Sequence, residues 1–395
     1  MSDAAALPPP HVLLDRALPE TANPVLTRAL AASLVMLILY GMTAHHVFFF
    51  PVDPTIAHLE DYVAFWLAAK ESVAGRLHEI YDPAAFRDRL PAYQALAWLF
   101  TPAGTIMFSP LAWLPYGPGK AFFYLCALAA IVGGGRALGL RGLWLAALAL
   151  APGLYVVLFM GQAAALFAGL MTAGLAFSRT RPILAGLCIA LLTSKPQYGL
   201  LIPVFLAARG EWRTVGWTVL FTIALHLASI ALYGLEAWRA FFATLGGMHF
   251  EHMGKPHPMM VAVKIHLVKW GAPLVLANAI QLAALAGMAW ATWVAARRFD
   301  RATAIAVVLI GTFLASPYVW HYDMGLAAIG IALLAARGPA LPLWGQAALA
   351  VLWFCPPLIF IVTPVQLFPT VPFAAGLGLL AVFLVARPEA ERVGA

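Results

Sequence analysis

Apolar runs separated by short polar gaps occupy most of the chain. They cover residues 28–48, 119–135, 142–160, 162–178, 182–194, 196–208, 213–233, 271–296, 302–316, 323–336, 341–361 and 366–387. A straight helix needs about 20 apolar residues to cross the hydrocarbon core of a bilayer, so the longer runs predict transmembrane helices. Several other runs are too short to cross alone. The pairs that meet around Gly161 and around Lys195–Pro196 therefore predict helices broken near one membrane face.

The long gap between the first two runs, residues 49–101, carries a helical pattern of its own. Apolar side chains recur at intervals of three to four residues, which gives one apolar face, at Tyr62, Phe65, Trp66, Ala69 and Val73. We expect an amphipathic helix over 61–75 that lies at the membrane interface, with Lys70 and Glu71 on its other face. Gly75 is a plausible C-terminal stop, and a second short helix is expected near 84–98 after the turn at Asp82–Pro83.

Composition supports a membrane protein and excludes other classes. Of the 395 residues, 63% are hydrophobic and only 10% are charged, against roughly 25% charged in an ordinary soluble domain. A soluble enzyme with a polar shell is therefore excluded, and so is a nucleic-acid-binding chain despite the net charge of +7. We predict an all-α polytopic domain over 26–388, with about 11–13 transmembrane helices and amphipathic helices in its first outer loop.

The two ends and the cysteines add little chemistry. Residues 1–25 lack the basic start and apolar stretch of a cleaved signal peptide, so we expect a cytoplasmic tail there and another over 389–395. Cys126, Cys188 and Cys355 all lie within apolar runs. They form neither a disulfide framework nor a paired zinc motif, and we expect no cofactor.

The arginines predict the sidedness of the chain. They mark the gaps between runs, at Arg28, Arg136, Arg141, Arg179, Arg181, Arg209, Arg213, Arg297, Arg298, Arg301, Arg337, Arg387 and Arg392. Placing these gaps in the cytoplasm puts both termini inside and makes runs 182–194 and 196–208 a hairpin. The opposite face then holds two long outer loops, 49–101 and 234–270. Seven of the 17 acidic residues lie in 49–101, and nine of the 11 histidines lie at this face, in or beside its loops and turns.

The polar residues at the helix breaks are candidates for chemistry. Lys195 lies in an otherwise apolar stretch beside Gln197, and an ionisable residue at membrane depth is by default a functional hypothesis. A lone ammonium needs an anionic partner, for which a lipid phosphate is suitable, although a lysine can also extend to the interface. Gln162 could bind a sugar hydroxyl or satisfy a freed backbone group. Another apolar stretch is interrupted by Trp320, His321 and Asp323. Trp320 could belong to the aromatic belt at the membrane interface, His321 could donate a hydrogen bond to a phosphate, and Asp323 could be a polar anchor.

Asp61 has two readings. At the start of the expected outer-loop helix, an aspartate commonly acts as the N-cap. A carboxylate above a membrane cavity is also a candidate general base, with the neighbouring Glu60 as its rival.

The second outer loop is rich in possible ligands. It contains His249, Glu251, His252, Lys255 and His257. Their spacing matches none of the strong metal motifs, so we expect a cationic surface for lipid head groups rather than a zinc site.

Taken in order, these elements resemble one family. They are Asp61–Tyr62, Gly75 and Tyr81, Pro110–Pro115, Gly161–Gln162, Lys195–Pro196, and Ser316–Pro317 followed by Trp320–His321. The chain resembles glycosyltransferase family 87, the polyprenyl-phosphate-mannose-dependent mannosyltransferases of the GT-C fold. The resemblance implies a multi-spanning enzyme with its active site on the non-cytoplasmic face, a lipid-phosphate sugar donor and a catalytic aspartate at Asp61.

The resulting hypothesis assigns roles by residue number. Asp61 is the general base, and the donor phosphate meets Lys195 and His321, with Lys255 and His249 as further contacts. Expected substrate-binding residues are Glu60, Tyr62, Tyr81, Gln162, Gln197, Trp320 and His257. The partners are a polyprenyl-phosphate sugar, a lipid or glycan acceptor and membrane lipids, and the expected location is a bacterial inner membrane with the site facing the periplasm.

Two other functions fit parts of the pattern. A carrier or flippase for a lipid-linked or small anionic solute would also use broken helices and buried Lys and His residues, but no internal repeat is visible. A non-enzymatic membrane scaffold would not explain the polar residues gathered on one face.

Overall fold

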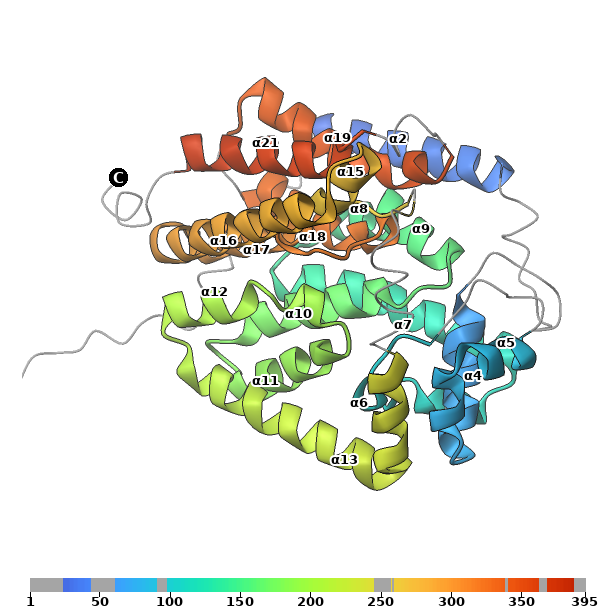
Figure 1. Ribbon diagram of the computed structural model, residues 1–395. Coiled ribbons are helices and arrows are strands. Elements are labelled where there is room, and N and C mark those ends of the chain that lie inside the picture. Colours follow the sequence, from blue (N-terminus) through green and yellow to red (C-terminus); the bar gives the residue numbers. More distant parts are fainter. Residues whose placement is uncertain are drawn as a thin grey trace, which may run out of the picture.

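The computed structural model describes residues 24–43, 61–90, 98–244, 257, 259–337, 340–361 and 368–386. Within these ranges the chain is helical, and the only β pairing is an isolated antiparallel bridge between Met260 and Trp320. The helices pack side by side in layers, with the short helices α4 and α5 gathered at one end (Figure 1). The predicted all-α membrane architecture is therefore confirmed. Most of the predicted tails and parts of both outer loops lie outside the described residues.

Each apolar run contains a helix. The helices are α2 (Pro24–Thr43), α7 (Tyr116–Ala137), α8 (Leu143–Ala149), α9 (Pro152–Phe159), α10 (Ala164–Phe177), α11 (Pro182–Leu191), α12 (Ile202–Arg209), α13 (Trp212–Thr244), α16 (Leu274–Arg298), α17 (Arg301–Ala315), α18 (Gly325–Arg337), α19 (Leu343–Ile361) and α21 (Thr370–Val385). Run 142–160 was predicted as one helix but is broken before Pro152, which opens α9 because proline fits the first turn of a helix. Helix α13 continues past the predicted end at 233, across a kink at Gly234.

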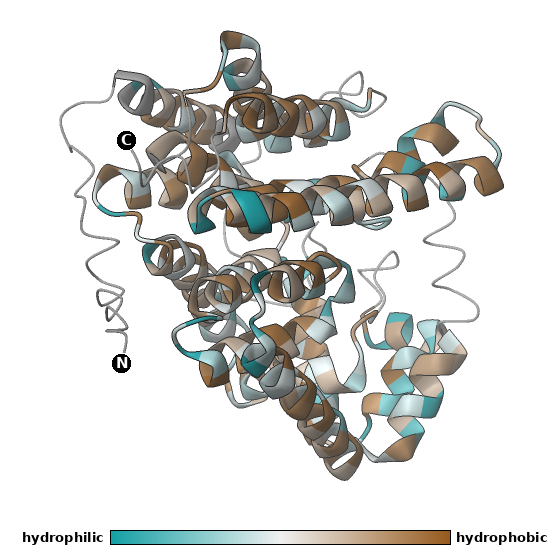
Figure 2. Ribbon diagram, turned by 90° about the vertical axis from the view of Figure 1, so that its left-hand side faces the viewer, coloured by the Kyte–Doolittle hydropathy of each residue, from teal (hydrophilic) through white to brown (hydrophobic). Residues whose placement is uncertain are grey.

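Three of the described helices are long and apolar enough to cross a membrane alone, namely α7, α13 and α16. Helices α13 and α16 bury little of their surface in the protein and expose large apolar side chains such as Leu227 and Trp290. Figure 2 shows brown, apolar positions along the helices and teal, hydrophilic positions mainly at helix ends and among the short helices. This exposed apolar surface suits contact with lipid rather than water.

The first outer loop is a packed group of short helices. It contains α4 (Tyr62–Val73), η1 (Leu77–Tyr81) and α5 (Pro83–Arg89), followed by α6 (Pro102–Thr105) and η2 (Ser109–Trp113). Helix α4 ends before Gly75, which adopts a φ of +73° as the predicted stop. The expected interfacial orientation is wrong in detail, because Val63, Leu67 and Ala68 are buried as well and Val73 is exposed. Helix α4 is a core helix of this group.

Charged residues of this group are paired inside the protein. Glu71, predicted on a polar face, is buried and forms ion pairs with Arg76 at 2.8 Å and Arg89 at 3.6 Å. Lys70 donates to the Ala112 carbonyl at 2.6 Å. The polar side of α4 therefore packs against η2 and the neighbouring arginines, and these contacts hold the helix in place.

The opposite end of the bundle is held by arginines. Arg301 pairs with the buried Glu211 at 2.6 Å and donates to the Leu175 carbonyl at 2.6 Å. Arg209 donates to the Phe299 carbonyl at 2.9 Å. These bonds satisfy C-terminal carbonyls that a helix leaves unpaired. They also bring three of the arginine-marked gaps to one end of the molecule, as the sidedness pattern requires.

Helices α11 and α13 depend on a close approach at one glycine. A Cβ added at Gly186 would lie 2.5 Å from Trp217 Cβ and 2.9 Å from the Thr218 nitrogen, whereas a Cβ at Gly216 on the facing helix would meet nothing within 4 Å. We expect Gly186→Val to destabilise the protein by about 1–3 kcal/mol through overpacking. Gly216→Val, the matched control, should leave the thermal unfolding midpoint in detergent unchanged. Equal midpoints for the two variants would contradict this packing.

Candidate active site

Asp61 stands directly before α4, but its side chain does not cap the helix. The residue has helical backbone angles, and no hydrogen bond joins its side chain to the first turn. Its carboxylate instead accepts a hydrogen bond from the side-chain amide of Gln162, and its backbone N–H donates to the Met160 carbonyl at 2.7 Å. The capping role is thereby excluded, and the carboxylate is oriented by the break between α9 and α10.

Gly161 makes this contact possible. It has a φ of +63°, and a Cβ at this position would lie 2.6 Å from the Tyr62 nitrogen and 3.3 Å from the Asp61 nitrogen. Only glycine adopts this backbone conformation freely while permitting such a close approach. The Gly161–Gln162 pair therefore positions the start of α4 rather than only ending a helix.

Lys195 lies at a second break, between η3 (Leu192–Ser194) and η4 (Pro196–Tyr198). The anionic partner that its ammonium needs is present within the protein, because Lys195 forms a buried ion pair with Asp323. The same carboxylate oxygen accepts from the Tyr198 hydroxyl at 2.7 Å, and the other oxygen accepts from the Trp320 backbone N–H at 2.9 Å. Asp323 thus joins the second break to the segment that contains Trp320 and His321.

Aromatic rings enclose the same ammonium. Lys195 Nζ lies 4.8 Å from the ring centroid of Tyr198, 5.4 Å from that of Tyr322 and 5.9 Å from that of Phe167. These distances are in the range of cation–π attraction. The rings come from η4, η6 (His321–Met324) and α10, so three elements converge on one charge.

The end of the second outer loop pairs with the Trp320–His321 segment. Val261 N–H donates to the Val319 carbonyl at 2.9 Å, and His321 N–H donates to the Met259 carbonyl at 3.1 Å. The exposed His257 lies over Trp320, with ring centroids 4.8 Å apart, and Trp320 stacks on Tyr322. His321 itself has no exposed surface. A ligand therefore reaches its ring only if one of these two segments moves.

Electrostatics link Asp61 to the Lys195–Asp323 pair. Burial raises the pKa of Tyr318, and the negative charges of Asp323 and Asp61 raise that pKa further, while a side-chain hydrogen bond with Trp320 opposes them. Both carboxylates therefore act on one half-buried tyrosine. Gly153 at the start of α9 would place a Cβ only 2.9 Å from the Gly325 nitrogen. The first residues of helix α9 therefore pack against the end of η6, and Met160, which follows the last residue of α9, accepts the hydrogen bond from Asp61.

Two predicted substrate-binding tyrosines belong to the core. Tyr62 is fully buried, and its ring packs against Tyr116 and Phe123 at 5.2 and 5.3 Å. Tyr81 is buried, and its hydroxyl donates to the Phe100 carbonyl at 2.7 Å. Both side chains therefore stabilise the outer-loop group in this structure.

The other predicted residues fall into two sets. Gln197 is half-buried at the second break, beside Lys195. Glu60, His249 and Lys255 lie outside the described residues. Among the residues that are described, no group of three or more His, Cys, Asp or Glu side chains could hold a metal ion.

Sequence reasoning missed Tyr198 and Tyr318, and it named Asp323 only as an anchor. Tyr198 follows the Lys195–Pro196 pair within a run read as apolar, and Tyr318 lies among aromatic residues assigned to a membrane belt. The usable signal was the position of both tyrosines next to a helix break. A buried hydroxyl at such a break usually has a hydrogen-bond partner.

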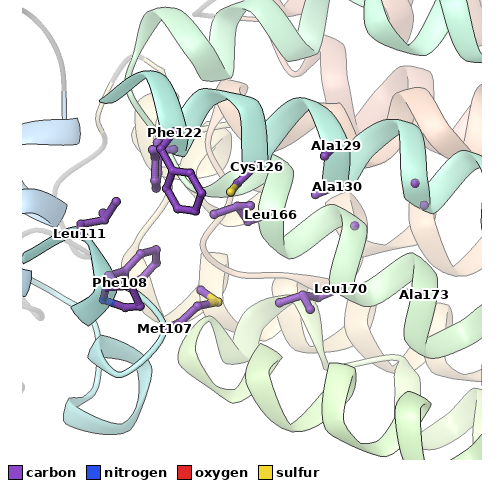
Figure 3. Close-up of a pocket in the computed structure, with 15 residues that line it drawn as sticks. Met107, Phe108, Leu111, Phe122, Cys126, Ala129, Ala130, Leu166, Leu170 and Ala173 are labelled. Carbon is purple, nitrogen blue, oxygen red and sulfur yellow. The ribbon is translucent and has the colours of Figure 1, made fainter. Parts of the chain in front are cut away.

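An apolar cavity of about 490 Å³ opens between α7 and α10. Figure 3 shows Phe122, Cys126 and Ala129 of α7 facing Leu166 and Leu170 of α10, with Met107 and Phe108 at one end.

Two aromatic rings, Phe108 at the cavity and Phe167 behind it, lead from this cavity toward Lys195. The Phe108 ring lies 6.5 Å from Phe167, whose ring centroid is 5.9 Å from the Lys195 ammonium. An apolar space therefore ends close to a fixed positive charge.

Comparison with known families identifies the class. The sequence profile of glycosyltransferase family 87 matches residues 98–317, which is more than half of the chain. The chain therefore belongs to glycosyltransferase family 87 and is a membrane glycosyltransferase. Neither a curated protein nor a solved structure matches the chain.

The Gly161 contact yields a test. Gly161→Ala would force a methyl group against Asp61–Tyr62 and should lower the rate of glycosyl transfer by at least tenfold, because small displacements of a catalytic group are costly. Gly75→Ala is the matched control, since Gly75 has a similar φ of +73° but open space around its Cβ position. Comparable rates for both variants would show that backbone strain, not displacement of Asp61, explains any loss.

Proposed function

We propose that this glycosyltransferase moves a sugar, mannose or a related sugar, from a polyprenyl-phosphate donor to a hydroxyl acceptor, with inversion. The acceptor is a lipid or a glycan at the non-cytoplasmic face of a bacterial inner membrane. The observation that carries the proposal is the Asp61 carboxylate, which is oriented by Gln162 and not consumed as a helix cap. A carboxylate held in this way is available to accept a proton.

The proposed step needs one base. Asp61 takes the proton of the acceptor hydroxyl while the oxygen attacks the anomeric carbon on the face opposite the phosphate. The bond from the anomeric carbon to the phosphate oxygen breaks, and polyprenyl phosphate leaves with the bonding electrons. One carboxylate suffices because the phosphate is already a good leaving group, in contrast to the two carboxylates of a glycosidase. Glu60 remains the alternative base.

Lys195 is the proposed cation for the departing phosphate. Its ammonium is fixed between Asp323 and three rings, and a preorganised charge stabilises a growing negative charge without reorganisation. Because His321 is enclosed, its contact with phosphate requires movement of the 257–261 or 316–320 segment. Lys255 and His249 are further proposed phosphate contacts. Gln162, Gln197, Trp320 and the exposed His257 would bind the sugar or acceptor.

The apolar cavity supports a lipid-linked donor. A polyprenyl chain is apolar and flexible, and the cavity between α7 and α10 is lined by small and apolar side chains. With the chain in this space, its phosphate end would lie toward Phe108 and Phe167, on the side of Lys195. A nucleotide sugar would leave the cavity unused.

A transporter remains the second function considered. Family membership favours transfer chemistry, and the polar residues at the breaks gather at one end of the bundle with the outer-loop helices. A transporter is expected to place its site near the membrane midplane between repeats.

The first test of the proposal replaces the base. Purified protein in nanodiscs would be incubated with a panel of polyprenyl-phosphate sugars and nucleotide sugars, and the products followed by mass spectrometry. Asp61→Asn should lower turnover by about 10²–10⁴-fold, the usual contribution of a general base. Asp82→Asn is the control, because Asp82 caps α5 in the same loop and asparagine caps equally well. Wild-type turnover in Asp61→Asn would refute the assignment.

A second test concerns the cavity. Gly133→Phe should fill it, since a Cβ at Gly133 meets nothing within 4 Å. We expect KM to rise about tenfold, or 1.4 kcal/mol, for a long-chain donor and to stay constant for a short-chain analogue. Gly287→Phe on α16, which also has open space at its Cβ position, is the control. An equal effect on both donors would exclude the cavity as the chain's site.

A further inference from the structure

Asp323 is the most enclosed carboxylate of the described site. It has no exposed surface and receives three donors, namely the Lys195 ammonium, the Tyr198 hydroxyl and the Trp320 backbone N–H. A buried carboxylate with this many donors is fixed in place. It is therefore a counter-charge held at one position beside Lys195.

The ammonium of Lys195 needs such a counter-charge. Only 8% of the residue is exposed, and a buried charge without a paired counter-charge is costly. The rings of Phe167, Tyr198 and Tyr322 attract the charge but supply no anion. Asp323 is the one ion-pair partner that the described structure gives to Lys195. Removing this carboxylate would take away the anion that holds the ammonium in place.

Other titratable groups surround the pair. They are Tyr198 on η4, His321 and Tyr322 on η6, Tyr318 in the preceding segment and, acting on Tyr318 and Tyr322, Asp61. The tyrosines are neutral at neutral pH, and Asp61 is bonded to Gln162 on a different break. The negative charge that compensates Lys195 within the described residues is therefore that of Asp323.

We propose that Asp323 is a positioning residue that pairs with the Lys195 ammonium and holds it in place, so that the donor phosphate becomes the second anion on one ammonium. This inference rests on the proposed function, because it concerns the phosphate of the same donor. Through Trp320, the same carboxylate also fixes the segment that pairs with the second outer loop. Asp323 acts through these neighbours and does not itself contact the reacting atoms.

The test is the split between donor KM and kcat. With the polyprenyl-phosphate sugar that the wild-type protein uses, Asp323→Asn should raise donor KM at least tenfold, because Lys195 loses the carboxylate that holds it in place, while kcat at saturating donor changes less. Asp323→Glu should recover the wild-type KM in part. Tyr198→Phe, which removes another donor to the same oxygen without changing charge, should keep it.

A double-mutant cycle tests the inference even if a single variant folds poorly. Lys195→Met and Asp323→Asn each leave one member of the pair without its partner, whereas the double variant removes both charges and should unfold at a higher temperature than Lys195→Met alone. If Asp323 acts through Lys195, adding Asp323→Asn to Lys195→Met should not raise donor KM further. An unchanged donor KM in Asp323→Asn, or independent effects of the two substitutions on KM, would overturn the inference. If the wild-type protein turned over none of the donors, this result would instead count against the proposed function. The unfolding temperatures of the Lys195 and Asp323 variants would still test the ion pair.

Discussion

A helix can be interrupted within a membrane only if the protein satisfies the backbone groups that the interruption frees. The described breaks obey this constraint. At the first break, Gly161 and Gln162 N–H donate to Leu158 and Val157, and the Met160 carbonyl accepts from Asp61. At the second, Lys195 N–H donates to the Leu192 carbonyl at 2.8 Å. Because each break must lie against protein, it packs on a neighbouring element, and the polar side chains meet partners there: Gln162 meets Asp61, and Lys195 meets Asp323.

The scarce charges follow the same logic. At the arginine-rich end, the arginines bind helix carbonyls and Glu211. These bonds lie within the protein and hold the helices together. At the opposite end, Asp323 and Lys195 compensate each other in a buried pair. The Asp61 carboxylate accepts a hydrogen bond from the neutral side-chain amide of Gln162. The distribution of charge therefore separates an end held by arginines from an end where carboxylates lie at helix breaks.

Hydrophobic periodicity predicted the helices well because lipid requires long apolar segments, and the breaks were visible as interruptions by Gly161 and Lys195–Pro196. The partners of those residues were not predictable in the same way. Nothing local in the sequence couples Lys195 to Asp323, which follows it by 128 positions. Helix α4 was misread as interfacial because its pattern shows one apolar face, whereas η2 and two arginines also cover its polar side. Such contacts depend on tertiary packing, which sequence periodicity does not encode.

The two carboxylates of the site illustrate how environment divides chemical roles between identical groups. Paired acids commonly differ in function because their surroundings push their protonation behaviour apart. Asp323 accepts from an ammonium, a hydroxyl and a backbone N–H and has no exposed surface, so its oxygens are closed to a substrate in this structure. Asp61 accepts from the Gln162 amide and is only partly buried, so this residue keeps some exposed surface. The difference between the two residues therefore depends on the helix breaks that hold each carboxylate, because the aspartate side chains themselves are identical.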